Sequence, residues 1–356
     1  MPKRLVLPSL LATLLLTGAG CITIGSSGQP GTPSGDGGIF KSANSGDTWT
    51  QKVAVPATDG TKRTIGGASV STVVQDPSDP QALYIGTTEN GLWMSLDGGD
   101  SWRTTPQVSR GAVTSVAVDP KQKCTVYATV ENKLVKTEDC TRTWAVRYLD
   151  SAADRLTTAV AVDSYNPQIV WLGNMNGSLF QSQDGGMTWK LTHAFDARIQ
   201  RIVMAANDSR RIFVALQNKG LWRTDDGGAN WKDLSPNYQK FVGSMDFTDL
   251  TLGVSEPKLI MFASKYGLLR SRDAGDTWEK VELLTPPGTT LIYSLAVDPR
   301  DPNVIYYGTA TTFYRSQNGG VNWIPKKLPT TRAATVLLVD RSNSAVLYMG
   351  TTKFKQ

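Results

Sequence analysis

Short apolar runs separated by turn residues follow one another along most of this chain, and no stretch keeps the 3.6-residue period of an amphipathic helix. Four such runs occur in succession at residues 113–119 (VTSVAVD), 125–130 (TVYATV), 133–137 (KLVKT) and 144–148. Runs of this length, rich in Val, Thr and Tyr, are typical of β-strands joined by tight turns. The pattern predicts an all-β protein built from units of four strands.

An eight-residue motif divides the chain into these units. It reads SQDGGMTW at 182–189 and recurs at 42–49, 95–102, 137–144, 224–231, 271–278 and 316–323. Its final tryptophans are 42–53 residues apart, a spacing at which each repeat is one supersecondary unit that must stack on its neighbours. The first strands of the other units are expected at 72–76, 159–163, 202–207, 245–249, 293–298 and 335–340.

The two ends of the repeat complete one another. The first motif lies between a third-strand run at 38–42 and a fourth-strand run at 48–53, whereas 335–340 and 345–350 supply a first and a second strand without a motif. Joining these halves makes one more unit, and ring closure of this kind removes open sheet edges. We therefore predict a single seven-bladed β-propeller of four-stranded blades over residues 37–356.

The motif has the chemistry of a turn. Asp or Asn at its third position accepts backbone N–H groups, glycine at its fifth permits a positive φ, and its tryptophan fills space between blades. We interpret it as structural rather than catalytic or calcium-binding, because chemistry repeated in every blade is what packing requires. The residues concerned are Asn44, Asp97, Asp139, Asp184, Asp226, Asp273 and Asn318, with Trp49, Trp102, Trp144, Trp189, Trp231, Trp278 and Trp323.

The motif, S-x-D-x-G-x-T-W, resembles the Asp-box of the bacterial neuraminidase repeat, which sialidases, sortilin-type receptors, xyloglucanases and the photosystem II assembly factor share. The resemblance covers residues 38–356 and implies a propeller whose motifs lie on the side away from the usual binding face. It does not specify chemistry, since one fold hosts many functions.

The first 36 residues read as an export signal and a tether. Residues 1–20 contain a basic pair, an apolar run too short to span a bilayer, and small residues before Cys21. This end is similar to a bacterial lipobox, although Gly18 stands where leucine is usual, and it implies a lipid on Cys21 that holds the protein to the outer surface of a membrane in the cell envelope. Ordinary secretory cleavage, which leaves a free thiol, is the alternative. Residues 21–36 are rich in Gly, Ser and Pro, which predicts a flexible tether.

The third copy of the motif departs from the others, because Thr141 stands where they have glycine. In the same unit Cys124 begins the second strand and Cys140 follows the third, so the hairpin between them brings both to the same end. We predict a Cys124–Cys140 disulfide, formed outside the cytoplasm, which fixes the turn that lacks glycine.

Basic residues precede the first strand of most blades, on the face that usually carries binding in propellers. Aligned on the acidic or Asn residue that ends each first strand, they predict a ring of positive charge around the mouth of the central channel. Solvated loop residues without a common function are the alternative. Aromatic residues in the same loops, Tyr148, Phe195, Tyr238 and Phe241, are expected to supply contact area. The basic residues are Arg110, Arg155, Arg198, Lys240 and Arg332, with Arg63 close by.

These features favour a non-catalytic, monomeric, membrane-tethered propeller of the assembly-factor or scaffold type, which binds a protein or an anionic polymer through its basic face. The formal charge of +6 is too mild to indicate nucleic acid, and a single histidine, His193, argues against a His-rich metal site. We expect no metal and no cofactor.

The main alternative is a glycoside hydrolase of the sialidase or xyloglucanase type. The F/Y-R-I-P sequence of sialidases is absent. Asp150, Asp154 and Asp196 nevertheless lie in the face loops, where two carboxyls roughly 5–9.5 Å apart would make an acid/base pair. A passive structural component of a surface assembly is a third interpretation.

Overall fold

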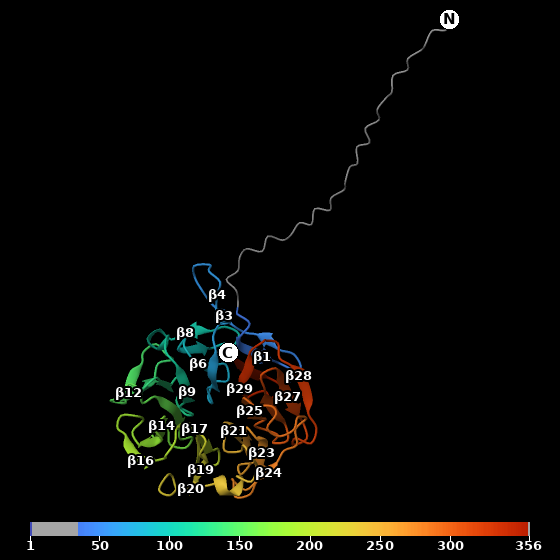
Figure 1. Ribbon diagram of the computed structural model, residues 1–356. Coiled ribbons are helices and arrows are strands. Elements are labelled where there is room, and N and C mark those ends of the chain that lie inside the picture. Colours follow the sequence, from blue (N-terminus) through green and yellow to red (C-terminus); the bar gives the residue numbers. More distant parts are fainter. Residues whose placement is uncertain (2–34, 355–356) are drawn as a thin grey trace. The chain divides into compact units, whose positions relative to one another are not determined.

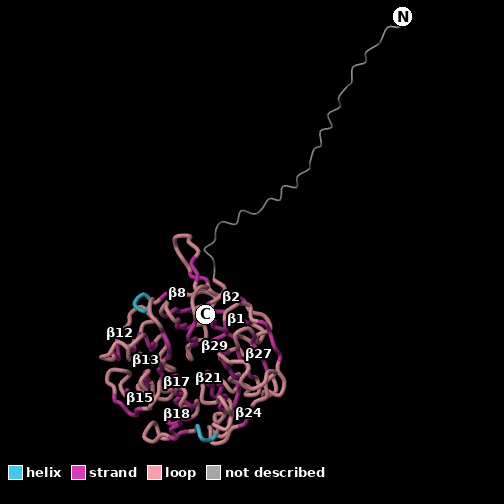
Figure 2. The backbone as a smooth tube through the Cα atoms, viewed as in Figure 1, coloured by secondary structure: helices cyan, strands magenta, loops and turns pink. Residues whose placement is uncertain are grey.

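The computed structural model describes Met1 and residues 35–354, so the predicted signal, Cys21 and most of the tether lie outside the described residues. Seven four-stranded antiparallel sheets follow one another around a central axis (Figure 1). Helical structure in the described part is limited to two 3-10 turns, η1 (Pro106–Val108) and η2 (Ser235–Asn237) (Figure 2). The prediction of an all-β, seven-bladed propeller is confirmed.

Each blade runs from an inner strand at the axis to an outer strand at the circumference. Blade 1 contains β5 (Val70–Gln75), β6 (Leu83–Thr87), β7 (Leu92–Ser95) and β8 (Arg103–Thr104). Blade 2 contains β9 (Val113–Val118), β10 (Val126–Val130), β11 (Lys133–Thr137) and β12 (Ala145–Leu149). Blade 3 contains β13 (Thr157–Val162), β14 (Val170–Asn174), β15 (Ser178–Ser182) and β16 (Lys190–Ala194).

The remaining blades repeat this order. Blade 4 contains β17 (Ile199–Ala205), β18 (Asp208–Leu216), β19 (Gly220–Thr224) and β20 (Lys232–Asp233). Blade 5 contains β21 (Phe247–Leu252), β22 (Ile260–Ser264), β23 (Gly267–Ser271) and β24 (Glu279–Lys280). Blade 6 contains β25 (Ser294–Val297), β26 (Ile305–Gly308), β27 (Thr312–Ser316) and β28 (Ile324–Lys327). A separate hairpin pairs β3 (Ala54–Val55) with β4 (Arg63–Thr64).

Blade 7 closes the ring from both ends of the propeller, as predicted. Its strand order is β29 (Ala333–Val339), β30 (Leu347–Thr352), β1 (Gly38–Ser42) and β2 (Thr50–Gln51). Antiparallel pairing runs from Gly38 opposite Thr351 to Ser42 opposite Leu347. Backbone hydrogen bonds between segments about 300 residues apart in sequence therefore hold the ring together.

The repeated motif forms the turn that its sequence predicts. In the fourth copy the Ser182 hydroxyl accepts Gly186 N–H at 2.8 Å, and Asp184 Oδ1 accepts Thr188 N–H at 2.8 Å. All six glycines at the fifth position have positive φ, between 83° and 96°. The Trp189 indole donates to the Arg147 carbonyl of blade 2 at 2.8 Å, so this tryptophan also joins neighbouring blades.

We expect the carboxylates of these turns to make stability fall in acid. Hydrogen bonds from the hydroxyl and N–H of Thr188 hold the pKa of Asp184 at about 2, against an ordinary value of 3.8. A carboxyl with a lowered pKa stabilises the fold fully above its unfolded value, and this contribution is lost as pH falls toward about 2. The melting temperature of the wild type, measured by calorimetry between pH 5 and pH 2, should therefore decrease steeply.

Two natural copies of the turn supply the control for that prediction. Asn44 accepts Thr48 N–H at 2.9 Å and donates to the Thr48 hydroxyl at 3.0 Å, so asparagine keeps the same contacts without a titrating group. D184N should therefore fold as stably as the wild type at pH 7 and show a shallower acid decrease. D184A should melt earlier at every pH above about 4, because it lacks the acceptors. Equal melting of D184A and the wild type at pH 7 would contradict the role of the turn.

The third copy is held by a different device. Thr141 adopts a φ of 69° where the other copies have glycine, a conformation that costs a β-branched residue free energy. Cys140 of this turn is joined by a disulfide to Cys124 at the other end of the β10–β11 hairpin, as predicted. The covalent link therefore compensates for the missing glycine.

Removal of the disulfide is expected to destabilise the propeller by about 3 kcal/mol, the entropic effect of a closed loop of this size. The C124S/C140S variant should melt several degrees below the wild type in calorimetry. Dithiothreitol should lower the wild-type melting temperature by a similar amount and leave the variant unchanged. A wild type that is insensitive to reduction would contradict this assignment.

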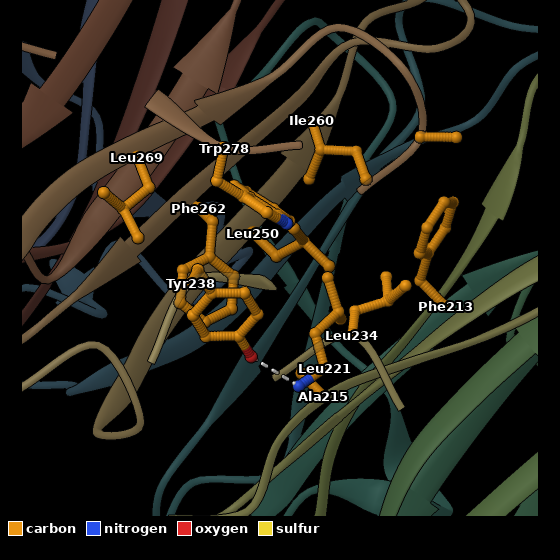
Figure 3. Close-up of a cluster of buried hydrophobic side chains, with 11 residues drawn as sticks. Phe213, Ala215, Leu221, Leu234, Tyr238, Leu250, Ile260, Phe262, Leu269 and Trp278 are labelled. Carbon is orange, nitrogen blue, oxygen red and sulfur yellow. Dashed lines mark hydrogen bonds between the residues drawn. The ribbon is translucent and has the colours of Figure 1, made fainter. Parts of the chain in front are cut away.

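Large apolar clusters fill the spaces between neighbouring blades. Figure 3 shows the cluster between blades 4 and 5, where Tyr238 and Trp278 pack beside Phe262. Their ring centroids lie 5.2 and 5.7 Å, respectively, from the centroid of the Phe262 ring. The Tyr238 hydroxyl accepts Leu221 N–H at 2.8 Å, and the ring is fully buried. The expectation that Tyr238 would contact a partner was wrong, because this side chain belongs to the core.

The inner strands of blades 4 and 5 are displaced from their predicted positions. We expected β21 to end at Asp249, but Asp249 is its third residue, and Gly253 takes the place of the strand-ending aspartates found elsewhere. Gly253 N–H donates to Leu259, as Asp119 N–H donates to Thr125 in blade 2. The alignment failed because a nearby aspartate was mistaken for the missing anchor.

Candidate functional site

One face of the propeller is built from the connections between outer and inner strands and from the hairpins between second and third strands. We call it the upper face. The eight-residue turns join the third and fourth strands and therefore lie at the opposite ends of the strands. The upper face is the side on which the sequence placed its candidate site residues.

A cavity of about 470 Å³ opens on the upper face between blades 2 and 3, and we call it the blade 2–3 cavity. The connection from β12 to β13 forms one wall, and the hairpin between β14 and β15 forms the other. This volume is within the range of roughly 300–1,000 Å³ typical of small-molecule sites. Its lining residues are Tyr148, Leu149, Asp150, Ser151, Arg155, Asn174, Asn176, Ser178 and Phe180.

Asp150 is the buried carboxylate of this cavity. It accepts the Tyr148 hydroxyl at 3.2 Å and Ala152 N–H at 3.1 Å, and Arg155 lies 4.0 Å away. Its backbone is fixed by two hydrogen bonds with Asn132 in the β10–β11 hairpin. Burial and the neighbouring carboxylate raise the pKa of Tyr148 to about 12, so its hydroxyl stays protonated and donates to Asp150. These contacts orient the Asp150 carboxylate.

The other two carboxylates that the sequence singled out are exposed. Asp154 lies in the same connection as Asp150, four residues further on, and Asp196 lies in the next connection between β16 and β17. Neither forms a salt bridge within the described residues. Asp150 and Asp154 are thus the two candidates that the fold brings into one loop.

Three of the predicted basic residues occupy equivalent positions on the upper face of consecutive blades. Arg110, Arg155 and Arg198 stand one to three residues before β9, β13 and β17, which are the inner strands of consecutive blades. Their side chains make no hydrogen bond to the described residues. These arginines form an arc beside the channel mouth rather than a complete ring.

The other predicted basic residues are placed differently. The Arg332 guanidinium donates to Asp36 and to the carbonyls of Gly67 and Ala68, and its side chain is only 10% exposed. These contacts stabilise the blade that closes the ring. Arg63 pairs with Asp59 in the β3–β4 hairpin. Lys240 stands seven residues before β21, beside the Phe241 ring, because the alignment on Asp249 displaced it by four positions.

The aromatic residues of these loops also divide between core and surface. Phe195 is buried against Trp222 and Trp231, so the expectation that it contacts a partner was wrong. Tyr148 is half-buried and lines the blade 2–3 cavity. His193 packs on Phe195 with ring centroids 4.3 Å apart, and burial lowers the pKa of its imidazole.

An ion pair at the inner strands was missed by the sequence analysis. Arg201 of β17 contacts Asp249 of β21, and Asp249 also accepts Leu295 N–H of β25 at 2.7 Å. Burial raises the pKa of Asp249, while Arg201 and the N–H donors of Leu250 and Leu295 oppose that shift. One carboxylate therefore joins the inner strands of three blades. The signal in the sequence was a charged residue within an otherwise uncharged strand.

No group of three or more His, Cys, Asp or Glu side chains within residues 35–354 is arranged to hold a metal ion. In the same part of the chain no helix has both the length and the apolar character needed to cross a bilayer. The expectations of no metal and no cofactor stay predictions.

Comparison with known proteins identifies sequence relatives among xyloglucanases, although no family model matches the chain. Xyloglucanase Xgh74A of Acetivibrio thermocellus is 24% identical over 264 residues, which cover 69% of this chain and 29% of that protein. A xyloglucanase of a Paenibacillus species is 24% identical over 351 residues, which cover 81% and 30% respectively. The chain spans less than one third of the length of these relatives.

The fold comparison finds two kinds of similar structure. The GH74 xyloglucanase of Xanthomonas campestris aligns with a TM-score of 0.63 at 16% identity, covering 80% of this chain and 51% of that one. YCF48 bound to D1 peptide aligns with a TM-score of 0.62 at 15% identity, covering 85% and 96%. YCF48 from Cyanidioschyzon merolae aligns with the same score at 13% identity, covering 80% and 95%. These likenesses show the propeller fold.

The sequence matches overturn one expectation. We expected a non-catalytic protein, but the relatives reported above are xyloglucanases, and they point to a glycoside hydrolase. The error arose because the repeated turns are structural, and the loop carboxylates show no catalytic motif in the sequence.

Proposed function

We propose that this chain is a glycoside hydrolase that cleaves a polysaccharide of the β-glucan class at the upper face of its propeller. The observation that carries the proposal is the sequence match to xyloglucanases over 69–81% of the chain. The blade 2–3 cavity supports it, because Asp150 lines the cavity and Asp154 lies in the same short connection.

In the inverting form of this reaction, one carboxyl donates a proton and another activates water. We assign the base to Asp150, which is buried and held by Tyr148 and Ala152, and the acid to exposed Asp154. Asp154 gives its proton to the leaving oxygen as the glycosidic C–O bond breaks. Water adds its hydroxyl to the anomeric carbon, and its proton passes to Asp150. The Cα atoms of residues four positions apart lie at most about 14 Å from each other, so this connection allows the required carboxyl separation of roughly 6.5–9.5 Å.

The test is incubation of the purified chain with xyloglucan, mixed-linkage β-glucan and sialyllactose, followed by a reducing-end assay and mass spectrometry. We expect shortened products from a β-glucan that disappear in D154N. D301N is the matched control, because Asp301 is an exposed aspartate on the opposite face that caps a turn through Asn303. Absence of products from every polysaccharide, or full activity of D154N, would overturn the proposal.

A second candidate function is the binding of a protein segment across the upper face. The observation that favours it is the match to nearly the whole length of YCF48, in a structure that contains a bound peptide. Arg155 and Arg198 would supply the contacts, since neither side chain donates a hydrogen bond to another described residue. Pull-down with R155E/R198E tests it: partner capture that is unchanged in the variant and insensitive to salt would reject it.

We also propose that the protein acts outside the cytoplasm, tethered by a lipid on Cys21. The basic and apolar residues before Cys21 and the disulfide of blade 2 support export. Mass spectrometry of the mature protein is the test. A diacylated N-terminal cysteine is expected, and an unmodified Cys21 thiol would reject the tether.

A further inference from the structure

Two aromatic rings form the apolar wall of the blade 2–3 cavity. Tyr148 and Phe180 lie 5.1 Å apart between ring centroids, inclined at 46°, and Trp189 packs edge-on behind Tyr148 at 6.0 Å. Both lining rings are half-buried, so each keeps part of its surface toward the cavity. The face of an aromatic ring is negative, and it attracts the C–H groups of a pyranose, which carry a small positive charge.

The β14–β15 side of the cavity also offers a hydrogen-bonding group that the protein leaves unused. Asn174 is buried, and its Oδ1 accepts Asn176 N–H at 3.0 Å and Ser178 N–H at 2.9 Å. Its Nδ2 donates to no group within residues 35–354. It is also not among the solvent-inaccessible polar atoms that lack a hydrogen-bond partner in that part of the chain, so it keeps some accessible surface. Because Asn174 lines the cavity, this donor is available to a ligand there.

Arg155 and Asp150 complete the set with donors and an acceptor. The Arg155 guanidinium is 53% exposed and lies 4.0 Å from Asp150, beyond hydrogen-bond distance. The cavity therefore presents N–H donors and a carboxylate acceptor around an aromatic wall. A hydroxyl group both donates and accepts, so a ring with several hydroxyls can satisfy both kinds of partner.

Charge decides between a neutral and an anionic ligand. The three connections that lead to β9, β13 and β17 contain three arginines and three aspartates. The arginines are Arg110, Arg155 and Arg198, and the aspartates are Asp150, Asp154 and Asp196. Their formal charges cancel, so this surface lacks the one-signed field that attracts a polyanion.

We propose that the blade 2–3 cavity is a subsite for one neutral pyranose ring of a glycan. Tyr148 and Phe180 pack on the C–H groups of the ring, while Asn174, Arg155 and Asp150 bind its hydroxyls. The proposal rests on the proposed glycoside hydrolase function for its ligand class. It differs from our first expectation of an anionic partner, because the aspartates of the same loops neutralise the arginines.

Calorimetric titration tests the subsite, with cellotetraose as the neutral probe and tetragalacturonate as the anionic one. Titrations in the D154N background keep the probe intact. F180L retains the apolar volume but removes the ring face, and it should weaken cellotetraose binding by about tenfold. R155Q should weaken it several-fold. Raising the salt concentration from 50 to 500 mM should leave cellotetraose affinity unchanged.

Matched variants separate the cavity from the rest of the face. Tyr314 of blade 6 occupies the strand position of Phe180, since it pairs with Tyr307 as Phe180 pairs with Leu172. Y314L should therefore bind cellotetraose as the parent does. Parent-like binding by F180L would overturn the subsite, and so would a preference for tetragalacturonate that declines with salt.

The same measurements distinguish this proposal from the proposed function. Cellotetraose binding that depends on Phe180, in a wild type that hydrolyses no glycan, would reject the enzyme and retain the subsite. Hydrolysis by a wild type whose F180L variant binds and cleaves normally would retain the enzyme and reject the subsite.

Discussion

Replacing Asp150 with asparagine is expected to lower kcat/KM for β-glucan hydrolysis by about 10³-fold, the contribution typical of a general base. Asparagine has the same shape and can still accept Ala152 N–H, which Asp150 accepts at 3.1 Å. Its amide NH2 takes the place of the oxygen that accepts the Tyr148 hydroxyl and can donate to that hydroxyl instead, so the connection from β12 to β13 should keep its conformation. What D150N lacks is the negative charge that takes a proton from water.

Three measurements make this prediction specific. Thermal melting of D150N should match the wild type, which separates a chemical defect from misfolding. Azide should restore part of the activity to D150N if the missing group is a base, because a small anion can enter the emptied position. Y148F should lose less activity than D150N, since it removes only one contact of Asp150. Activity of D150N within a few-fold of the wild type would assign the base to another carboxylate.

The architecture could be predicted from the sequence because the same turn and strand pattern is repeated in every blade. Every blade repeats one turn in which a hydroxyl residue, an Asp or Asn and, in six of the seven copies, a glycine each have one role toward the backbone that residue identity alone reveals. Closure could be predicted because the terminal units are complementary halves, and the pairing of β1 with β30 matches them. Local chemistry repeated seven times leaves few alternatives.

The site could be predicted only in part, because its walls come from different blades. Asp150 and Arg155 were singled out in one loop, but Asn174 and Phe180 reach the same cavity from the next blade. The sequence does not show that these side chains line one cavity, since this depends on how neighbouring blades pack. Arg332 was predicted to bind a partner, but its guanidinium donates to Asp36, almost 300 residues away in sequence. The alignment of the blades did not indicate this contact.

The register of blade 5 failed for a related reason. Short inner strands contain too few residues to align by apolar pattern alone, so a single aspartate decided their position. Asp249 fitted the pattern of a strand-ending turn residue, whereas its carboxylate in fact bonds to neighbouring blades. A buried charge in an apolar strand needs partners from outside that strand, and those partners cannot be read from it.

Asp249 is therefore expected to be the most sensitive single position for stability. D249A removes the acceptor of two backbone N–H groups, Leu250 at 2.8 Å and Leu295 at 2.7 Å, and leaves Arg201 without its partner. Leaving a buried N–H without an acceptor costs about 1–3 kcal/mol, and loss of the ion pair itself adds less, because the Arg201 side chain is 48% exposed. Denaturation by guanidinium chloride should show that decrease, and D249N should lose less, because its amide oxygen still accepts one N–H.

The neighbouring Asp246 provides the matched control for this prediction. Its contact with Lys265 is 3.9 Å long and both side chains are exposed, so D246A should change stability by less than about 1 kcal/mol. Since Asp249 joins β17, β21 and β25, its loss should also accelerate hydrogen exchange at the inner strands of all three blades. Equal stabilities of D249A and D246A would mean that packing, rather than this carboxylate, holds the centre of the ring.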